Sequence, residues 1–379
     1  MGRWGVRLAA AGLMAVTAWC GVTVDALPRL AGWAVALGSW GRNPAAAMAA
    51  VQQLAEESAA SVESPAPESS PSPEPQPSAA PTPEASPLAT PQPEATPAPG
   101  PAATPAASPA PAPEDAGSIR TTFYEQGSGD GYIPAGTGSI KNSTSLADSQ
   151  VADIISRGMP FGIELHSDEP QVLIMHTHAT ETYELADNGW YDPDFTCRST
   201  DNAVNMTAVG AEMVRVLNAA GINTVQDTTL HDYPSYNGSY ERSNETVRGW
   251  LEKYPSIKVV LDVHRDAIEQ EDGTRLKPTL QTEEGPAAQV MIICGADKGG
   301  NLPNYTQNLR FAAAWEAAME AQTPGLTRPV MLAYRYYNQD LTTGSLLIEV
   351  GGHANTLDEA VRAGGLAARA LASLLAQTA

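Results

Sequence analysis

Hydrophobic residues in the C-terminal half of the chain follow two periods, and these predict alternating strands and helices. Nearly continuous apolar runs, typical of strands buried on both faces, lie at residues 172–175, 257–263, 289–295 and 346–350. A shorter run at 222–225 predicts a further strand. Apolar residues at helical spacing predict helices over residues 203–219, 243–253, 304–322 and 356–375.

This alternation predicts the α/β class, with a single mixed or parallel sheet flanked by helices on both faces. We assign this catalytic domain to residues 161–379, which is long enough for one substantial core. Residues 118–160 are mixed and Gly-rich, with a short helix expected within 144–157. We expect them to lead into the domain and to wrap its edge.

The N-terminus carries a positive flank followed by an apolar run. Arg3 and Arg7 precede an apolar stretch that begins at Leu8 and ends before Asp25. Its length is near the lower limit for crossing a bilayer, about 17 residues. We predict an uncleaved signal anchor or transmembrane region within residues 1–40, with the arginines in the cytoplasm and the rest of the chain outside. The alternative is a cleaved signal peptide, and both interpretations export the C-terminal part.

Residues 41–117 are predicted to form a disordered linker. From Glu56 to Asp115 the chain consists mostly of Pro, Ala, Ser, Thr and Glu. Such a segment has too few apolar side chains to offset its ordering entropy. Its prolines favour an extended spacer, which would hold a catalytic domain away from a membrane.

Charge and cysteine content narrow the possible partners and redox chemistry. The formal net charge of −21 argues against nucleic acid as a partner, because binding it requires basic patches. Of the three cysteines, only Cys197 and Cys294 lie beyond the apolar N-terminus, so at most one disulfide is possible there. Cys294 lies in an apolar run and is predicted to be a buried thiol.

Residues that could bind a metal ion lie where three predicted strands end. The chain has only six histidines, and several follow these strands together with acidic residues. In open α/β sheets, ligand-binding groups collect beyond the C-terminal ends of the strands. Histidine nitrogens and carboxylate oxygens are preferred zinc ligands, and a catalytic zinc site keeps one position open. The sequence therefore predicts a metal site, and its candidate residues are His176, His178, His264, Glu349 and His353.

Four motifs carry a resemblance to a known family. They lie at His176–Tyr183, Asp262–Asp266, Tyr337–Asp340 and Leu347–Thr356. From Gln171 onward the chain resembles the stage II sporulation protein P family. The resemblance implies a zinc-dependent N-acetylmuramoyl-L-alanine amidase that acts on peptidoglycan during sporulation. It also implies partnership with stage II sporulation proteins D and M in engulfment of the forespore.

The domain also resembles the broader cell-wall amidase fold, in which two histidines and a carboxylate bind Zn²⁺. By position, His178 and His264 match the histidine ligands, and Glu349 matches the catalytic glutamate. For the carboxylate ligand we favour Glu181 over Asp201, because N-capping alone explains an aspartate at a helix start.

Two further residues have open roles. His176 is either a ligand or a residue that orients one. Arg265 is either an ion-pair partner of Glu349 or a contact for a stem-peptide carboxylate, since guanidinium matches carboxylate geometry. In the expected mechanism, zinc activates water and polarises the amide carbonyl, and Glu349 transfers the proton.

Two other functions compete with the amidase hypothesis. One is a zinc endopeptidase that cuts peptidoglycan cross-links, an activity with which the family is also credited. The other is a non-catalytic module that binds the cell wall. The presence of His178, His264 and Glu349 argues against a module that has lost its catalytic activity. Metal analysis would discriminate most directly between an enzyme and such a module.

Overall fold

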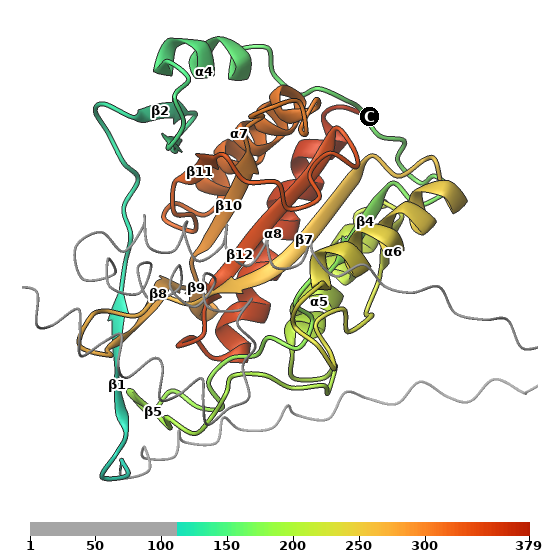
Figure 1. Ribbon diagram of the computed structural model, residues 1–379. Helices are drawn as coiled ribbons and strands as arrows, with labels where there is room; N and C mark the ends of the chain where they lie inside the picture. Colours follow the sequence, from blue (N-terminus) through green and yellow to red (C-terminus); the bar gives the residue numbers. More distant parts are fainter. Residues whose placement is uncertain (1–111) are drawn as a thin grey trace, which may run out of the picture. The chain divides into compact units, whose positions relative to one another are not determined.

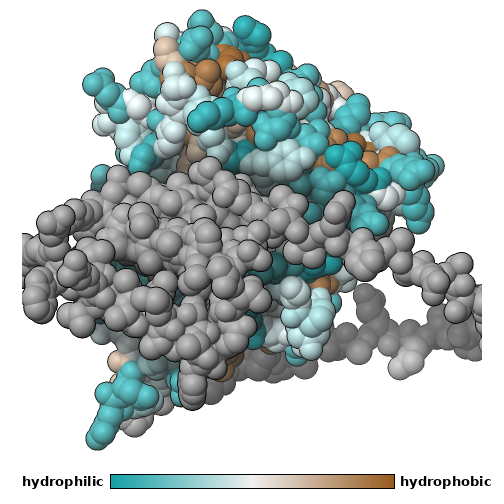
Figure 2. Space-filling view, viewed as in Figure 1, coloured by the Kyte–Doolittle hydropathy of each residue, from teal (hydrophilic) through white to brown (hydrophobic). Residues whose placement is uncertain are grey.

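The computed structural model describes residues 112–379 (Figure 1). The predicted anchor and most of the predicted linker therefore lie outside the described residues. Within residues 112–379, no helix is both long and apolar enough to span a membrane. The part of the surface visible in Figure 2 that belongs to these residues is largely hydrophilic, with small hydrophobic patches.

An eight-stranded mixed sheet forms the centre of the described region (Figure 1). In spatial order, its strands are β2 (Tyr132–Ala135), β3 (Gly138–Asn142), β11 (Val330–Ala333), β10 (Val290–Gly295), β12 (Gly344–Gly352), β7 (Val259–Asp266), β4 (Val172–Met175) and β6 (Thr224–Gln226). From β12 to β6 all neighbours are parallel, whereas β10 runs antiparallel to β12. The predicted central strands are therefore confirmed, with bounds that differ by a few residues.

Helices cover both faces of this sheet, as the sequence pattern predicts. Apolar residues of α5 (Met206–Ala219), α7 (Tyr305–Gln322) and α8 (Leu357–Ala376) form the main core with one face. On the opposite face, α6 (Ser239–Lys253) packs over β4 and β7 in a smaller cluster. The short helix α4 (Asp148–Ile155) lies against α7 and β2.

Local hydrogen bonds set the helix starts near the site. Thr356 and Glu359 form a capping box that begins α8, directly after β12. Helix α5 begins at Met206, later than predicted, because the Asn205 side chain caps it by accepting a hydrogen bond from the Thr207 N–H. These caps fix the two helices that follow site-bearing segments.

The segment expected to lead into the domain is part of its fold. It supplies β2 and β3 to the main sheet and β1 (Gly117–Thr122) to a second sheet. That second, four-stranded sheet also contains β5 (Trp190–Tyr191), β8 (Arg275–Thr282) and β9 (Gly285–Ala288). The compact unit therefore starts well before residue 161. Cys197 and Cys294 are both buried and free, so the expected buried thiol is confirmed at Cys294.

Candidate active site

Three polar side chains of the site share the sheet face that α6 covers. Strand β7 alternates, so Leu261 and Val263 enter the main core while Asp262 and His264 point to the opposite face. Glu349 on β12 is the register partner of His264 on β7. Neighbouring side chains in register lie on the same face, so the sheet itself places Glu349 beside His264.

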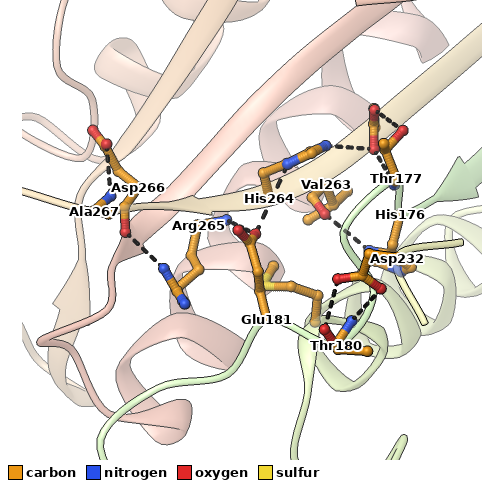
Figure 3. A network of polar contacts seen from close by, with 12 residues as sticks. His176, Thr177, Thr180, Glu181, Asp232, Val263, His264, Arg265, Asp266 and Ala267 are labelled. Carbon is orange, nitrogen blue, oxygen red and sulfur yellow. Dashed lines mark hydrogen bonds and ion pairs between the residues drawn. The ribbon is translucent and has the colours of Figure 1, made fainter. Parts of the chain in front are cut away.

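His264 is held between two carboxylates. Its Nε2 lies 2.8 Å from Oδ1 of Asp262, at an angle too bent for a regular hydrogen bond. Its Nδ1 lies 3.8 Å from Oε2 of Glu181 (Figure 3). Burial lowers the pKa of His264, but the carboxylates of Asp262, Glu181 and Glu349 together raise it to about 9. Asp262 itself is fixed by the backbone N–H and hydroxyl of Thr177, at 2.8 and 2.7 Å.

Glu181 enters the site from the turn that follows β4. The Glu181 N–H donates to the His178 carbonyl, which makes this turn tight. Its Oε2 accepts from the backbone N–H of Arg265 at 3.3 Å, and its Oε1 lies 3.7 Å from the Arg198 guanidinium. Figure 3 shows the Glu181 carboxylate pointing toward His264 and Arg265.

His178 completes this group. Its ring centroid lies 5.2 Å from that of His264, and its Nδ1 is buried without a hydrogen-bond partner. Burial and the nearby His264 lower the pKa of His178 to about 3, so its imidazole is neutral at physiological pH. A neutral imidazole with an unused nitrogen is the form that binds a metal ion.

These residues suit zinc in chemistry and position, although their side chains do not yet form a cage. Among the described residues, no three His, Cys, Asp or Glu side chains converge closely enough to hold a metal. Two ligand atoms on a tetrahedral zinc lie roughly 3.3–3.5 Å apart, from bond lengths of about 2.0–2.2 Å. The 3.8 Å between His264 Nδ1 and Glu181 Oε2 exceeds this by only a few tenths of an ångström. With Asp262 beside Nε2, the opposite nitrogen of His264 is the one available for a metal.

Glu349 stands out because its carboxylate has no protein partner. The residue is half-buried, and its Oε2 is buried without a hydrogen bond. Burial, with a further contribution from Asp266, raises its pKa to about 8. Within residues 112–379 it makes no ion pair, so the expected alternative of a salt bridge to Arg265 is absent there.

The other predicted site residues point elsewhere. His176 Nδ1 donates to the Val263 carbonyl at 3.0 Å, and its Nε2 accepts from the Gln226 amide at 3.1 Å. Both ring nitrogens are therefore used within the protein, which does not match a metal ligand. Asp201 is exposed, and its carboxylate accepts a hydrogen bond from the Ala203 N–H. Glu181, not Asp201, lies beside His264.

Arg265 also differs from expectation. Its side chain is buried and donates to the backbone carbonyls of Thr182, Cys197 and Asp266. These contacts join β7 to the loop that carries Glu181. Neither of the two roles predicted for Arg265 matches this placement, because the guanidinium holds backbone instead of a carboxylate.

An aromatic wall beside the histidines was not assigned from the sequence. The Tyr236 ring stacks on His178 with centroids 4.5 Å apart, and Tyr240 lies edge-on to His178 at 5.5 Å. Tyr337 stacks on Tyr240 at 5.4 Å. Tyr337 lies in a motif that resembles the family, but a tyrosine in a loop gives no periodic signal that would place it in a site. The wall offers ring faces suited to a sugar or peptide substrate.

The sheet and these side chains define an α/β protein with a candidate hydrolytic site at the C-terminal ends of its parallel strands. The chain belongs to the stage II sporulation protein P family, whose sequence model matches residues 104–372. It is 32% identical over 213 residues to the stage II sporulation protein P of Bacillus subtilis (strain 168). That match covers 53% of this chain and 50% of the relative, so it spans about half the length of the curated protein.

Two solved structures resemble this chain at low sequence identity. The CwlD amidase from Clostridioides difficile, in complex with the GerS lipoprotein, is 10% identical with a TM-score of 0.35, covering 55% of this chain and 99% of that one. The N-acetylmuramoyl-L-alanine amidase AmiC2 of Nostoc punctiforme is 10% identical with a TM-score of 0.32. That match covers 55% of this chain and 96% of AmiC2.

Proposed function

We propose that this protein is a peptidoglycan hydrolase of sporulation that cleaves the amide between N-acetylmuramic acid and the L-alanine of the stem peptide. One observation carries the proposal. A glutamate with a buried, unpartnered carboxylate oxygen, Glu349, sits in register beside His264, which in turn faces Glu181. Most buried polar groups have a partner, so an unpaired oxygen beside candidate metal ligands suits a group that acts on a bound molecule.

In this proposal His178, Glu181 and His264 hold Zn²⁺, whose chemistry when bound is to polarise the amide carbonyl as a Lewis acid. Asp262 keeps His264 oriented by occupying its Nε2 side. Glu349 accepts a proton from the attacking water and returns it to the leaving amide nitrogen. Burial favours the protonated form that Glu349 holds between these two steps, and a bound cation would favour the ionised form that accepts the first proton.

Two measurements on the purified full chain test the proposal. Metal analysis should find about one zinc for each folded chain, and digestion of purified cell wall should release intact stem peptides that begin with L-alanine. Folded protein without zinc would contradict the metal assignment. Products cut only within the peptide cross-links would instead identify the endopeptidase alternative, and no product at all would favour a module that only binds the wall.

We extend the proposal to the place and partners of the reaction. The N-terminal anchor would tether the chain to a membrane, with the described region outside the cytoplasm and stage II sporulation proteins D and M as partners. Family membership supports this extension. Cell fractionation and co-purification from sporulating cells would test it, and a chain found wholly in the cytoplasm would contradict it.

A further inference from the structure

Arg328, which directly precedes β11, has buried donors that the protein leaves unused. The residue is only 7% exposed. Its Nη1 donates to Oδ2 of Asp266 at 2.9 Å. Its Nε and Nη2 are buried and have no hydrogen-bond partner. Leaving buried donors of a charged group unsatisfied is costly, so these two N–H groups call for an acceptor.

The two unused nitrogens form one edge of the guanidinium. Nε–H and one Nη2–H point in parallel, which is the geometry that matches both oxygens of a carboxylate. Asp266 occupies only the other side of the group through Nη1. Arg328 is therefore already oriented by Asp266 and presents a free edge for a second carboxylate.

Arg328 lines a cavity of about 430 Å³. Met291 and Met331 contribute apolar walls, and the Tyr124 ring lies 5.7 Å from the guanidinium carbon of Arg328. The remaining charged residues of the cavity wall, Lys141, Glu125 and Glu269, are exposed, and Glu269 is 3.7 Å from Arg275. Exposed charges are screened by solvent, so the buried Arg328 dominates recognition inside the cavity.

The cavity adjoins the candidate active site. Met291 on β10 is the register partner of Glu349 on β12, so both side chains lie on the same sheet face. Asp266 follows His264 by two residues on β7, so the ion pair of Asp266 and Arg328 lies along the strand that carries the site. A substrate held at Glu349 could therefore extend into the cavity.

We propose that Arg328 is a substrate-binding residue that recognises a carboxylate of the stem peptide through its Nε–Nη2 edge. The proposal rests on the proposed function, since that function makes the stem peptide part of the substrate. Two stem residues carry carboxylates with the required chemistry. They are the second residue, glutamate, and the diamino acid that follows it.

Calorimetry with a free stem tripeptide of alanine, γ-linked glutamate and diaminopimelate tests the proposal without turnover. The probes are the unmodified peptide and two versions, one amidated at the glutamate carboxyl and one at the diaminopimelate carboxyls. Amidating the carboxylate that Arg328 holds should weaken binding to the full chain about 10- to 100-fold, the range for a hydrogen-bonded charge pair. Amidating the other should have little effect, so the two arms identify the source.

Arg328→Lys supplies the second half of a double-mutant cycle. Lysine keeps the charge next to Asp266 but lacks the paired N–H edge. The variant should bind unmodified peptide as weakly as the native chain binds the amidated one, and amidation should cause it no further loss. The matched control is Arg310→Lys, because Arg310 donates only to backbone carbonyls at residues 157–159, away from the cavity.

The outcomes separate this inference from the proposed function. Binding that ignores amidation of every carboxylate, or no binding of the peptide, would overturn the role of Arg328. The comparison of peptides on the native chain decides this even if Arg328→Lys fails to fold. A chain that binds the peptide through Arg328 but releases nothing from cell wall would support the role of Arg328. The same result would contradict the proposed hydrolase function.

Discussion

Two glutamates in this molecule, Glu349 and Glu316, have almost the same pKa but very different surroundings. Burial raises the pKa of both to about 8. Glu316 on α7 is fully buried, and its Oε1 accepts hydrogen bonds from the Thr327 hydroxyl and the Gln126 amide. Glu349 is half-buried, lies beside His264 and accepts no hydrogen bond from residues 112–379.

The comparison shows that a raised pKa does not by itself identify a proton-transfer group. Both shifts have the same main cause, which is desolvation. Glu316 packs so closely that a Cβ at Gly138 would come within 2.6 Å of its side chain, so no substrate can reach it. Oε2 of each glutamate is buried without a hydrogen bond from residues 112–379, so access and the neighbouring histidines distinguish Glu349, and each can be tested by substitution.

Replacing each glutamate by glutamine should give the largest contrast. Glutamine has nearly the same shape but cannot accept a proton, so Glu349→Gln should lower turnover by about 10²- to 10⁴-fold while zinc stays bound. Glu316→Gln should keep near-native turnover, because it lies outside the site. Release of stem peptide from cell wall and metal content are the measurements. Equal losses in the two variants would erase the functional distinction between the glutamates, and loss of zinc from Glu349→Gln would make Glu349 a ligand.

A smaller effect should follow from changing what orients His264. Asp262→Asn removes the negative charge beside Nε2 but keeps the side-chain size. Loss of such an orienting partner typically lowers metal affinity by about 10- to 100-fold. Competition with a zinc chelator would measure it. Unchanged affinity would mean that His264 needs no orienting carboxylate, and that the electrostatics around Glu349 do not depend on this pair.

The smallest expected effect is on stability and concerns Glu316. Its pKa is about 8 in the folded chain against an ordinary 4.5, so only the folded state holds the proton between these pH values. Its contribution to stability is therefore complete below pH 4.5, falls as the pH rises and is lost above about 8. The native chain should lose at most about 1.4 kcal/mol for each pH unit relative to Glu316→Gln. Denaturant unfolding from pH 5 to 8 measures this, and parallel curves for the two proteins would contradict it.

The sequence predicted the centre of the fold better than its periphery. Strands β4, β7, β10 and β12 were recognisable because burial on both faces favours nearly continuous apolar runs. Strand β8 was missed because it contains Lys277 and Pro278, and the buried Lys277 is neutralised by ion pairs with Glu359 and Asp187. Strands β2 and β3 are short and flanked by glycines, so they carry no clear period.

The candidate site likewise contains some residues that the sequence could identify and others that it could not. His178 and His264 could be named because histidine is rare in this chain and both follow predicted strands, whereas Glu181 and Glu349 were assigned through the family resemblance. The environments of His176 and Arg265 could not be inferred, since their partners Gln226 and Thr182 come from distant segments. Arg328 gave no local signal either, because its importance lies in which donors remain unpaired after folding.

The pairing of β1 has a mechanical consequence for the cavity around Arg328. Tyr124 follows β1 closely and is fixed by reciprocal hydrogen bonds with the Gln289 side chain. Strand β1 lies between β8 and β5, and its parallel ladder with β8 runs from Ile119 to Thr122. A pull on the chain at Gly117 along the strand would load that ladder in shear, so several hydrogen bonds would share the force. Strand β1 would then bear tension applied on its N-terminal side, so this tension would not displace Tyr124.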